Sequence, residues 1–354
     1  MQSPHLSRLV RKIESWFLRY QRPLPWRHSY DPYHVWVSEV MLQQTRMEVV
    51  LPYFERFIAR FPSLSSLAAA SEQEVLACWS GLGYYRRARM LHQGAQTVIA
   101  TGGTVPAGIE ALMKLPGIGR YTAGAIASIA WNRKAPIVDG NIARIASRLF
   151  GIEESAGSAR LMKEAWTVAT RLVEACKEPR LFNQGLMELG ALICRPRDPL
   201  CSRCPLTAEC NAKQTGRQTL LPLPREVKST YQMRVPLYLI SDDRGRILMR
   251  RETGALMQSM YHLPHGVDFL FAAAPLAAEV HEELGSFRHS ITDRRVSFVV
   301  QRAGLRGRIR DGIEEYEWIE PSSLADIPHP SYVAKALRLW SRSVSGARSA
   351  DGSR

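Results

Sequence analysis

Long apolar runs are missing from this chain of 354 residues. No stretch reaches the roughly 18 apolar residues that a transmembrane helix needs, which argues against a membrane-spanning protein. Residues 1–20 form an amphipathic helical pattern, without the compact apolar segment and small-residue cleavage site of an export signal. We therefore expect a cytosolic protein with no membrane partner.

Acidic residues are scarce relative to basic ones. The chain carries 47 Lys and Arg against 33 Asp and Glu, which gives a formal net charge of +14 and a pI of about 9.8. An excess of this size draws a protein to polyanions, of which nucleic acid is the commonest. Charge alone does not identify the partner, because many basic proteins bind no DNA.

Strand-like alternation is almost absent from residues 6–212. Helical periodicity runs through most of this stretch, and Pro and Gly interrupt it at short intervals. At roughly 150 residues per domain, the chain has room for two or three domains. We predict an all-α region over residues 1–212.

The second part of the chain has a different pattern. Residues 213–234 are rich in Pro, Thr and basic residues and lack a period, which predicts a linker. A smaller α+β domain is predicted over residues 235–340, followed by a disordered basic tail over residues 341–354. Within that domain we expect a helix over residues 272–285 and strands over residues 235–240, 246–251, 296–301 and 315–320.

Disulfides are not expected, although the chain has six cysteines, because cytosolic proteins rarely form them. Four of the cysteines fall within residues 194–210, separated by six, two and five residues. Zinc ribbons usually pair two close knuckles across a long gap, and only Cys201 and Cys204 form such a knuckle here. A compact loop of four cysteines is more typical of a [4Fe–4S] cluster, whose predicted ligands are Cys194, Cys201, Cys204 and Cys210.

Three arginines, Arg195, Arg197 and Arg203, lie between these cysteines. A loop tied to a cluster would hold their guanidinium groups in place for the phosphates of DNA. Charge alone is equally compatible with a solvated basic loop.

Residues 109–131 predict two helices joined by a tight turn at residues 116–119. Gly117 and Gly119 let the backbone turn sharply and approach another surface. The free N–H groups at the start of the second helix suit a phosphate. The pattern resembles a helix-hairpin-helix, which grips the DNA backbone, although such a turn alone is often only structural. Downstream, Asp139 precedes a helical stretch and is by default its N-cap.

The hairpin, the aspartate and the four-cysteine loop, in this order, resemble the endonuclease III superfamily of DNA glycosylases. Individual motifs match its MutY branch, which excises adenine paired with 8-oxoguanine, over nearly all of residues 10–212. The resemblance implies a six-helix part with the hairpin over about residues 23–137 and a cluster part formed by residues 1–22 and 138–212. The matching motifs are LPWR (24–27), VSEVMLQQT (37–45), GLGYYRRAR (81–89), LPGIGRYTAGA (115–125), VDGN (138–141), FNQGLMELGALIC (182–194) and the cysteine loop.

The resemblance assigns the chemistry to two carboxyl groups. Glu39 matches the glutamate that acts as general acid and protonates adenine, and its apolar neighbours are of the kind that raise a carboxyl pKa. Asp139 matches the carboxylate that stabilises the oxocarbenium-like sugar. Bifunctional members carry a lysine just after the hairpin, which forms a Schiff base with the sugar. Tyr121 stands there, and no lysine follows before Lys134, so we expect a monofunctional glycosylase.

Further positions match residues that surround the substrate. Asn141 and Glu188 join Tyr121 as assistants of catalysis, and Trp26 and Arg27 match the adenine pocket. Because the target base must flip out of the duplex, other side chains contact the DNA or the opposite base. In the all-α region these are Gln43, Gln44, Thr45, Leu82, Tyr84, Gly117 and Gly119; for Tyr84, core packing is the alternative.

Residues 235–340 resemble the Nudix-like domain with which this family inspects 8-oxoguanine. Residues 278–285 match the centre of a Nudix box, but the box lacks its arginine, glycine and glutamate, so metal-dependent pyrophosphate hydrolysis is not expected. The Phe-Ser-His recognition turn of the family is replaced by Ile291, Thr292 and Asp293. Ile291 keeps an apolar wedge and Thr292 a hydroxyl, whereas Asp293 adds a negative charge near the DNA.

The expected substrate is double-stranded DNA in which adenine faces 8-oxoguanine or guanine, bound by a monomer at the nucleoid of a bacterial cytoplasm. Three other functions remain open: a bifunctional pyrimidine-lesion glycosylase, a Nudix hydrolase and a non-catalytic DNA-binding module. Tyr121 argues against the first and the incomplete box against the second. The joint presence of Glu39 and Asp139 argues against the third.

Overall fold

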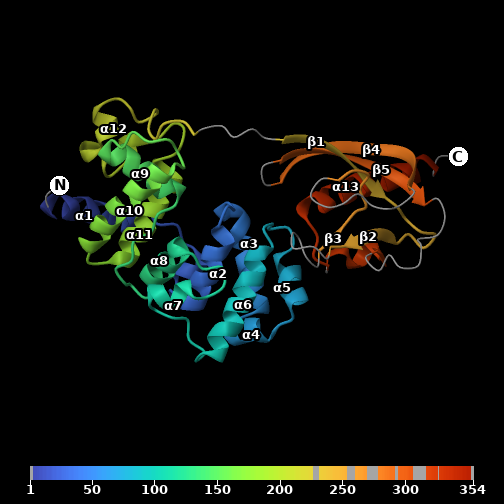
Figure 1. Ribbon diagram of the computed structural model, residues 1–354, viewed down its shortest axis with the longest axis horizontal. Coiled ribbons are helices and arrows are strands. Elements are labelled where there is room, and N and C mark those ends of the chain that lie inside the picture. Colours follow the sequence, from blue (N-terminus) through green and yellow to red (C-terminus); the bar gives the residue numbers. More distant parts are fainter. Residues whose placement is uncertain are drawn as a thin grey trace. The chain divides into compact units, whose positions relative to one another are not determined.

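The chain divides into two compact units. The computed structural model describes residues 3–225, 231–252, 260–268, 278–291, 294–305, 316–325 and 327–351 (Figure 1). The first unit comprises Met1–Ala69 and Met90–Val227, and the second comprises Ala70–Arg89 and Lys228–Arg354. In these described parts, no helix is both long and apolar enough to cross a bilayer.

The first unit is helical throughout, as the periodicity predicts. Local signals explain where its helices begin and end: Asp31 and Ser158 accept hydrogen bonds from the first free N–H groups of α2 and α10, and Gly151 ends α9 with φ 69°. Its elements are α1 (Ser3–Tyr20), η1 (Pro25–Arg27), α2 (Pro32–Leu42), α3 (Met47–Arg60), α4 (Leu64–Ala69), most of α6 (Arg86–Ala100), α7 (Ile109–Met113), α8 (Arg120–Ile129), α9 (Gly140–Phe150), α10 (Ala159–Glu174), α11 (Pro179–Glu188), one π-helical turn η2 (Leu189–Ile193), η3 (Cys201–Arg203), η4 (Thr207–Glu209) and α12 (Asn211–Gln214).

Helix α8 lies at the centre of the first unit, against α2, α7 and α11. Its residues from Thr122 to Ile129 are all buried, and most of them are small. A Cβ atom at Gly124 would overlap the carbonyl oxygen of Pro136, so this close approach requires glycine. The hairpin before α8 therefore has the predicted form, with α7 and α8 joined at residues 116–119.

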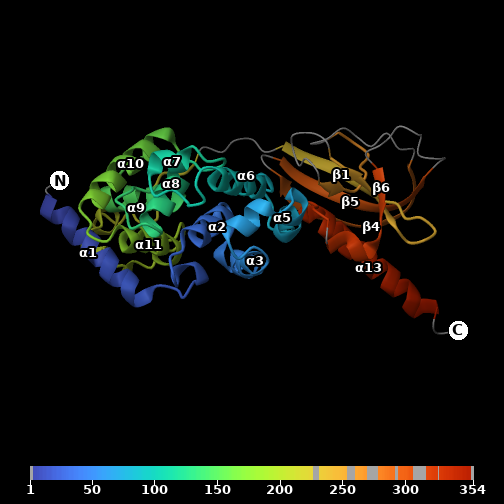
Figure 2. The same cartoon turned by 90° about the horizontal axis from the view of Figure 1, so that it is seen from below.

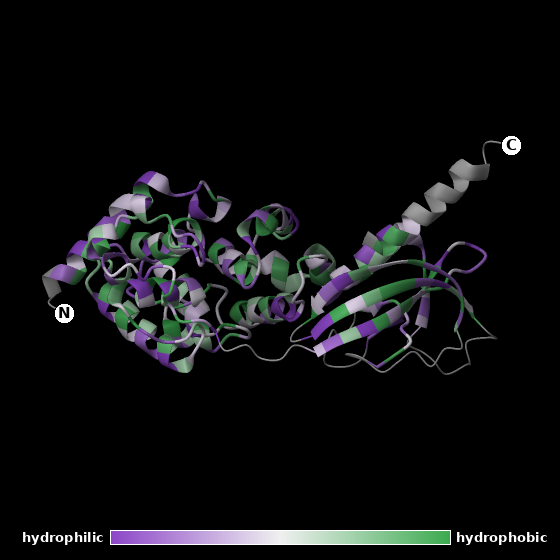
Figure 3. Ribbon diagram, turned by 90° about the horizontal axis from the view of Figure 1, so that it is seen from above, coloured by the Kyte–Doolittle hydropathy of each residue, from purple (hydrophilic) through white to green (hydrophobic). Residues whose placement is uncertain are grey.

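The second unit is α+β. Two three-stranded sheets have the orders β1-β5-β4, in which β1 and β5 are parallel, and β3-β2-β6, which is antiparallel. Along several strands polar and apolar residues alternate, as Figure 3 shows by colour. Its elements are α5 (Glu72–Trp79), β1 (Tyr231–Leu239), β2 (Ile247–Arg251), β3 (Tyr261–His262), β4 (Ala278–Ile291), β5 (Arg294–Leu305), β6 (Tyr316–Ile319), η5 (Pro321–Ala325) and α13 (Ser331–Asp351).

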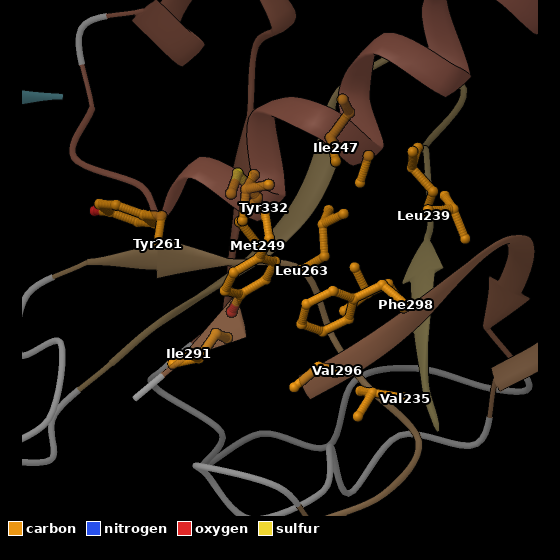
Figure 4. Packing of buried hydrophobic residues seen from close by; sticks show 14 residues of the cluster. Val235, Leu239, Ile247, Met249, Tyr261, Leu263, Ile291, Val296, Phe298 and Tyr332 are labelled. Carbon is orange, nitrogen blue, oxygen red and sulfur yellow. The ribbon is translucent and has the colours of Figure 1, made fainter. Parts of the chain in front are cut away.

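One core joins the two sheets and the helix of the second unit. Tyr332 of α13 stacks on Phe298 of β5, with ring centroids 4.7 Å apart. Met249 and Leu263 reach the same cluster from the other sheet and the segment after it (Figure 4). The predicted strands over residues 235–240, 246–251, 296–301 and 315–320 correspond to β1, β2, β5 and β6.

The helix predicted over residues 272–285 is wrong where the structure describes it. Residues 278–285 belong to β4, which pairs with β5 in antiparallel register; residues 272–277 lie outside the described part. Leu284 and Phe287 pack onto the core, and two register irregularities interrupt the ladder. Pairing with an apolar neighbour strand decides the conformation here, against the helical preference of the segment.

Two boundaries also differ from the prediction. Residues 341–351, predicted as a disordered tail, continue α13 (Figure 2), because a helix whose first turns are anchored in a core extends at little cost. Of the predicted linker, Leu221 and Leu223 are bound to the first unit by Arg148 Nε and the Glu154 carbonyl, and residues 231–234 belong to β1. Within the predicted linker, only residues 226–230 lie outside the part of the chain that the structure describes.

The close packing at Gly124 predicts that an alanine there lowers the free energy of unfolding, whereas helix propensity predicts that it raises it. Helix propensity alone would make Gly124→Ala stabilising by about 1 kcal/mol. We expect instead a loss of about 1–3 kcal/mol, because the new methyl group overlaps the Pro136 carbonyl. Denaturant unfolding measures the difference. Gly140→Ala, at the first position of α9 where a Cβ meets no atom within 4 Å, is the control and should not lower stability.

Candidate active site

Glu39 is a carboxyl group inside the protein. It lies in the last turns of α2, is 3% exposed, and is surrounded by buried residues of the same helix. Burial is the main reason why its pKa rises to about 7, and the negative charge of Asp139 raises it further. A hydrogen bond with Tyr121 and the positive charge of Arg27 oppose this rise. A large fraction of Glu39 is therefore protonated near neutral pH.

Tyr121 brings helix α8 into the site. It lies in the first turn of α8, one residue after the hairpin, and its hydroxyl is hydrogen-bonded to Glu39. Burial, together with the charges of Glu39 and Asp139, holds the pKa of this phenol well above its usual range. The hydroxyl therefore keeps its proton near neutral pH and can donate it to Glu39.

Asp139 is both an N-cap and a member of the site. Its Oδ1 accepts the amide of Ile142 at 2.8 Å, which caps α9, and its Oδ2 accepts Nδ2 of Asn141 at 3.0 Å. The positive end of the α9 dipole favours a negative charge at this position. The capping role expected by default is thus confirmed, and the same carboxylate lies close enough to Glu39 for its charge to raise the pKa of Glu39.

Two buried arginines of α9, which sequence reasoning missed, connect this site to the cysteine loop. Arg144 donates to Asn141 Oδ1 at 2.9 Å and to the Cys194 carbonyl at 2.8 Å. Arg148 donates to Cys194 Sγ at 3.4 Å and to the carbonyl of Arg195 at 2.7 Å. The sequence signal was two basic residues, four apart, on a helix whose other residues are almost all apolar.

The cysteine loop brings its four thiols together. Burial is the main reason why the pKa of Cys204 rises to about 12, and the charges of the other three thiolates add to it. Cys210 responds in the same direction to Cys194 and Cys201. In the residues that the structure describes, no group of three or more His, Cys, Asp or Glu side chains is arranged to hold a single metal ion.

Glu188 is a buried carboxyl group that is paired with two arginines. It is 1% exposed, and its two oxygens accept from Arg22 and Arg27 at 2.8 and 2.6 Å. Arg27 also donates to Gln184 at 2.9 Å and lowers the pKa of Glu39. Glu188 is thus a counter-ion of Arg27, and its role as a catalytic assistant stays a prediction. Beside it, Trp26 is buried edge-on against Phe54.

The predicted DNA contacts of the first unit lie at two turns. After α2, Gln44 is exposed with φ 55°, a conformation that non-glycine residues rarely adopt, while Gln43 is held by Thr122 and lies beside Thr45. In the hairpin, Gly117 has φ 75°, and a Cβ there would lie 2.5 Å from that of Met90. The space around Gly119 is open, so another surface can approach the backbone.

The remaining predicted contacts belong to the second unit, since residues 70–89 group with it and not with the predicted part 23–137. Tyr84 is 57% exposed, whereas Leu82 is buried. Ile291 is 8% exposed and packs in the core cluster of the second unit (Figure 4), and its role as a wedge stays a prediction. Thr292 and Asp293 lie outside the described residues.

Comparisons with known proteins agree on one family. Residues 37–171 match the model of the HhH-GPD superfamily of base excision DNA repair proteins. An adenine DNA glycosylase of Buchnera aphidicola (subspecies Schizaphis graminum) is 38% identical over 93% of this chain and 97% of its own length. The adenine DNA glycosylases of rat and human are 44% and 42% identical over 60% and 62% of this chain. The match spans only 43% of each of these longer mammalian relatives.

Solved structures support the fold of the first unit. A thermostable thymine-DNA glycosylase is 30% identical, with a TM-score of 0.54 over 60% of this chain and 100% of its own. A trapped endonuclease III–DNA covalent intermediate, at 21% identity and a TM-score of 0.50, covers 61% of this chain and 99% of its own. At that identity the second likeness shows the fold alone.

The raised pKa of Glu39 makes a stability prediction. Between the ordinary pKa of 4.5 and about 7, the folded protein binds more protons at Glu39 than the unfolded chain. Its stability therefore falls as pH rises through this window. Glu39→Gln removes this loss, so the variant should be more stable than the parent at pH 8, by about 3 kcal/mol as an upper bound.

Thermal unfolding at pH 5 and pH 8 measures this difference, which should shrink at the lower pH. Glu55→Gln, at an exposed position of α3, is the control and should show no pH-dependent gain. An equal effect of Glu39→Gln at both pH values would contradict the assignment.

Proposed function

The chain belongs to the adenine DNA glycosylase family, and from this premise we propose that it hydrolyses the N-glycosidic bond of adenine in duplex DNA. The adenine excised is the one that faces 8-oxoguanine or guanine, and the reaction starts base excision repair. The observation that carries the proposal is the buried Glu39 carboxyl with a pKa of about 7, hydrogen-bonded to Tyr121 and next to Asp139.

Glu39 supplies the proton. Adenine leaves poorly as an anion, so a proton on its imidazole-ring nitrogen lowers the barrier to breaking the bond between the base and C1′. Only an uncharged carboxyl can give that proton, and burial keeps Glu39 uncharged in a large fraction of molecules at neutral pH. The Tyr121 hydroxyl then stabilises the carboxylate that the transfer leaves.

Asp139 stabilises the positive sugar that the departing base leaves behind. Its carboxylate is held in place by Ile142 and Asn141, so it does not have to reorganise as charge develops. Water adds its oxygen to C1′, one water proton returns to Glu39, and the products are free adenine and an abasic sugar. Without a lysine at the position of Tyr121, the site has no amine there to form a Schiff base and break the strand.

We also propose a [4Fe–4S] cluster held by Cys194, Cys201, Cys204 and Cys210. Burial and the charges of neighbouring thiolates raise the pKa of Cys204 and of Cys210, so the four thiols lie close together, and four thiolates there would need a cationic partner. Such a cluster is ligated by four thiolates and cross-links the loop that carries them. The loop would then hold three arginines for the phosphates of DNA: Arg195, Arg197 and Arg203.

DNA binding requires contacts on both strands. Gln43, Gln44 and Thr45 follow the helix of Glu39, and the open backbone at Gly119 precedes the free amides of α8. We propose that these two turns contact the duplex around the flipped adenine. We propose that Leu82 and Tyr84 contact the opposite base and that the second unit inspects it as a Nudix-like domain, with one monomer acting on one site.

A single-turnover assay tests the reaction. Duplexes carry one adenine opposite 8-oxoguanine, guanine or thymine and are analysed with and without alkali. We expect adenine release opposite the first two bases only, with strand breaks only after alkali. Glu39→Gln should lower the rate at least 100-fold. Strand breaks without alkali would contradict the monofunctional mechanism, and no adenine release from the parent protein would contradict the function.

Metal analysis tests the cluster. The purified protein should contain about four iron and four sulfide per chain, and Cys204→Ser should lose most of both. Cys176→Ser is the control, because this buried thiol lies outside the loop and donates to the Val173 carbonyl. Zinc in place of iron would favour a mononuclear site and contradict the proposal.

A further inference from the structure

The turn between α5 and α6 is held in an uncommon conformation. Gly81, Gly83 and Tyr84 have φ values of 93°, 76° and 51°, all in the left-handed region. Glycine adopts such values freely, but a tyrosine does so only where its surroundings impose it. Tyr84 is also the exposed side chain of this turn. Its direction therefore depends on whatever holds the turn.

One set of contacts holds the middle of the turn from α5 and α6. The carbonyl of Gly83 accepts the indole N–H of Trp79 at 3.1 Å and Nη2 of Arg87 at 3.2 Å. The Arg87 guanidinium lies 5.6 Å from the centroid of the Trp79 ring and 5.3 Å from that of Tyr84. These contacts place Tyr84 against a cation, on one side of the turn.

A second set reaches the turn from the carboxyl-terminal part of the same unit, through Tyr85. This side chain is 6% exposed. Its hydroxyl accepts the Gly81 amide at 3.1 Å and donates to the carbonyl of His329. A phenol has one proton to donate and two lone pairs, so both bonds can form at once. The hydroxyl oxygen of Tyr85 thereby binds both Gly81 of the turn and His329, in the segment before α13.

The acceptor of Tyr85 is itself fixed on both sides. The Pro328 carbonyl accepts the amide of Tyr261 in β3 at 2.8 Å, and the Pro330 carbonyl accepts that of Val333 in α13 at 3.0 Å. Tyr261 and Val333 belong to the core of the second unit. The sheets and α13 therefore fix the position of the His329 carbonyl. Because Tyr85 binds both this carbonyl and Gly81, it fixes the turn relative to them.

We propose that Tyr85 is a positioning residue through which the carboxyl-terminal part of the second unit sets the direction of Tyr84 for the strand opposite the excised adenine. The inference rests on the proposed function for the role of Tyr84 and goes beyond it for Tyr85. The turn that carries Tyr84 and the β-sheets, although far apart in the sequence, then act together in recognising the opposite base. A ring that served core packing alone would not need its hydroxyl.

Tyr85→Phe keeps the ring and removes both hydrogen bonds. In the full-length protein without DNA, hydrogen–deuterium exchange of the amides of residues 80–86 should become about fivefold faster, as expected for the loss of the hydrogen bond from the Gly81 amide to Tyr85. In single turnover, the preference for adenine opposite 8-oxoguanine over guanine should fall by a similar factor. The pH midpoint of the rate should not move, because Glu39 and its partners are untouched.

Tyr332→Phe is the matched control, since it removes a buried phenol of the same unit that lies in the core beside Phe298. It should leave exchange in residues 80–86 unchanged. Unchanged exchange in Tyr85→Phe would overturn the positioning role, whatever the activity. Faster exchange with an unchanged preference would overturn its link to the opposite base. No adenine release by the parent protein would instead overturn the proposed function.

Discussion

A buried carboxyl group, Glu39 of α2, is the constraint on which the first unit depends. Water cannot reach Glu39 freely, so protein groups must satisfy its hydrogen-bonding capacity. Tyr121 does this from α8, and the small residues of α8 let that helix lie deep between α2 and α11. The Ala- and Gly-rich sequence of α8, which by itself suggests no function, is therefore required to place Tyr121 beside Glu39.

The charged groups around this carboxyl follow a single rule: each buried charge has a partner of opposite sign or a set of main-chain acceptors. Arg22 and Arg27 share Glu188, and Arg144 lies between Asn141 and the Cys194 carbonyl. Removing one member would leave the other charge buried and unpaired, which costs more than the pair itself contributes. The site is thus rigid because its polar groups restrain one another.

Local patterns predicted the helices well, because each is bounded by a cap, a proline or a glycine close in the sequence. The resemblance to a known family, and not a local pattern, selected Glu39, Tyr121 and Asp139, which the fold brings together. Contacts between distant segments could not be predicted from local patterns. The pairing of residues 278–285 with residues 300–305 joins segments about 15 to 27 residues apart, and the two arginines of α9 bind carbonyls about 50 residues away. Period and composition do not encode such partners.

Arg148 has an evolutionary consequence. Three of its four acceptors are main-chain carbonyls, those of Leu221, Arg195 and Pro196. A carbonyl is present whatever side chain occupies the position, so those three positions can drift in sequence without losing their bonds. The guanidinium itself has no substitute with the same forked geometry. For these three bonds, selection therefore acts on the arginine alone. We expect homologous chains to keep Arg148 and to vary at positions 195, 196 and 221.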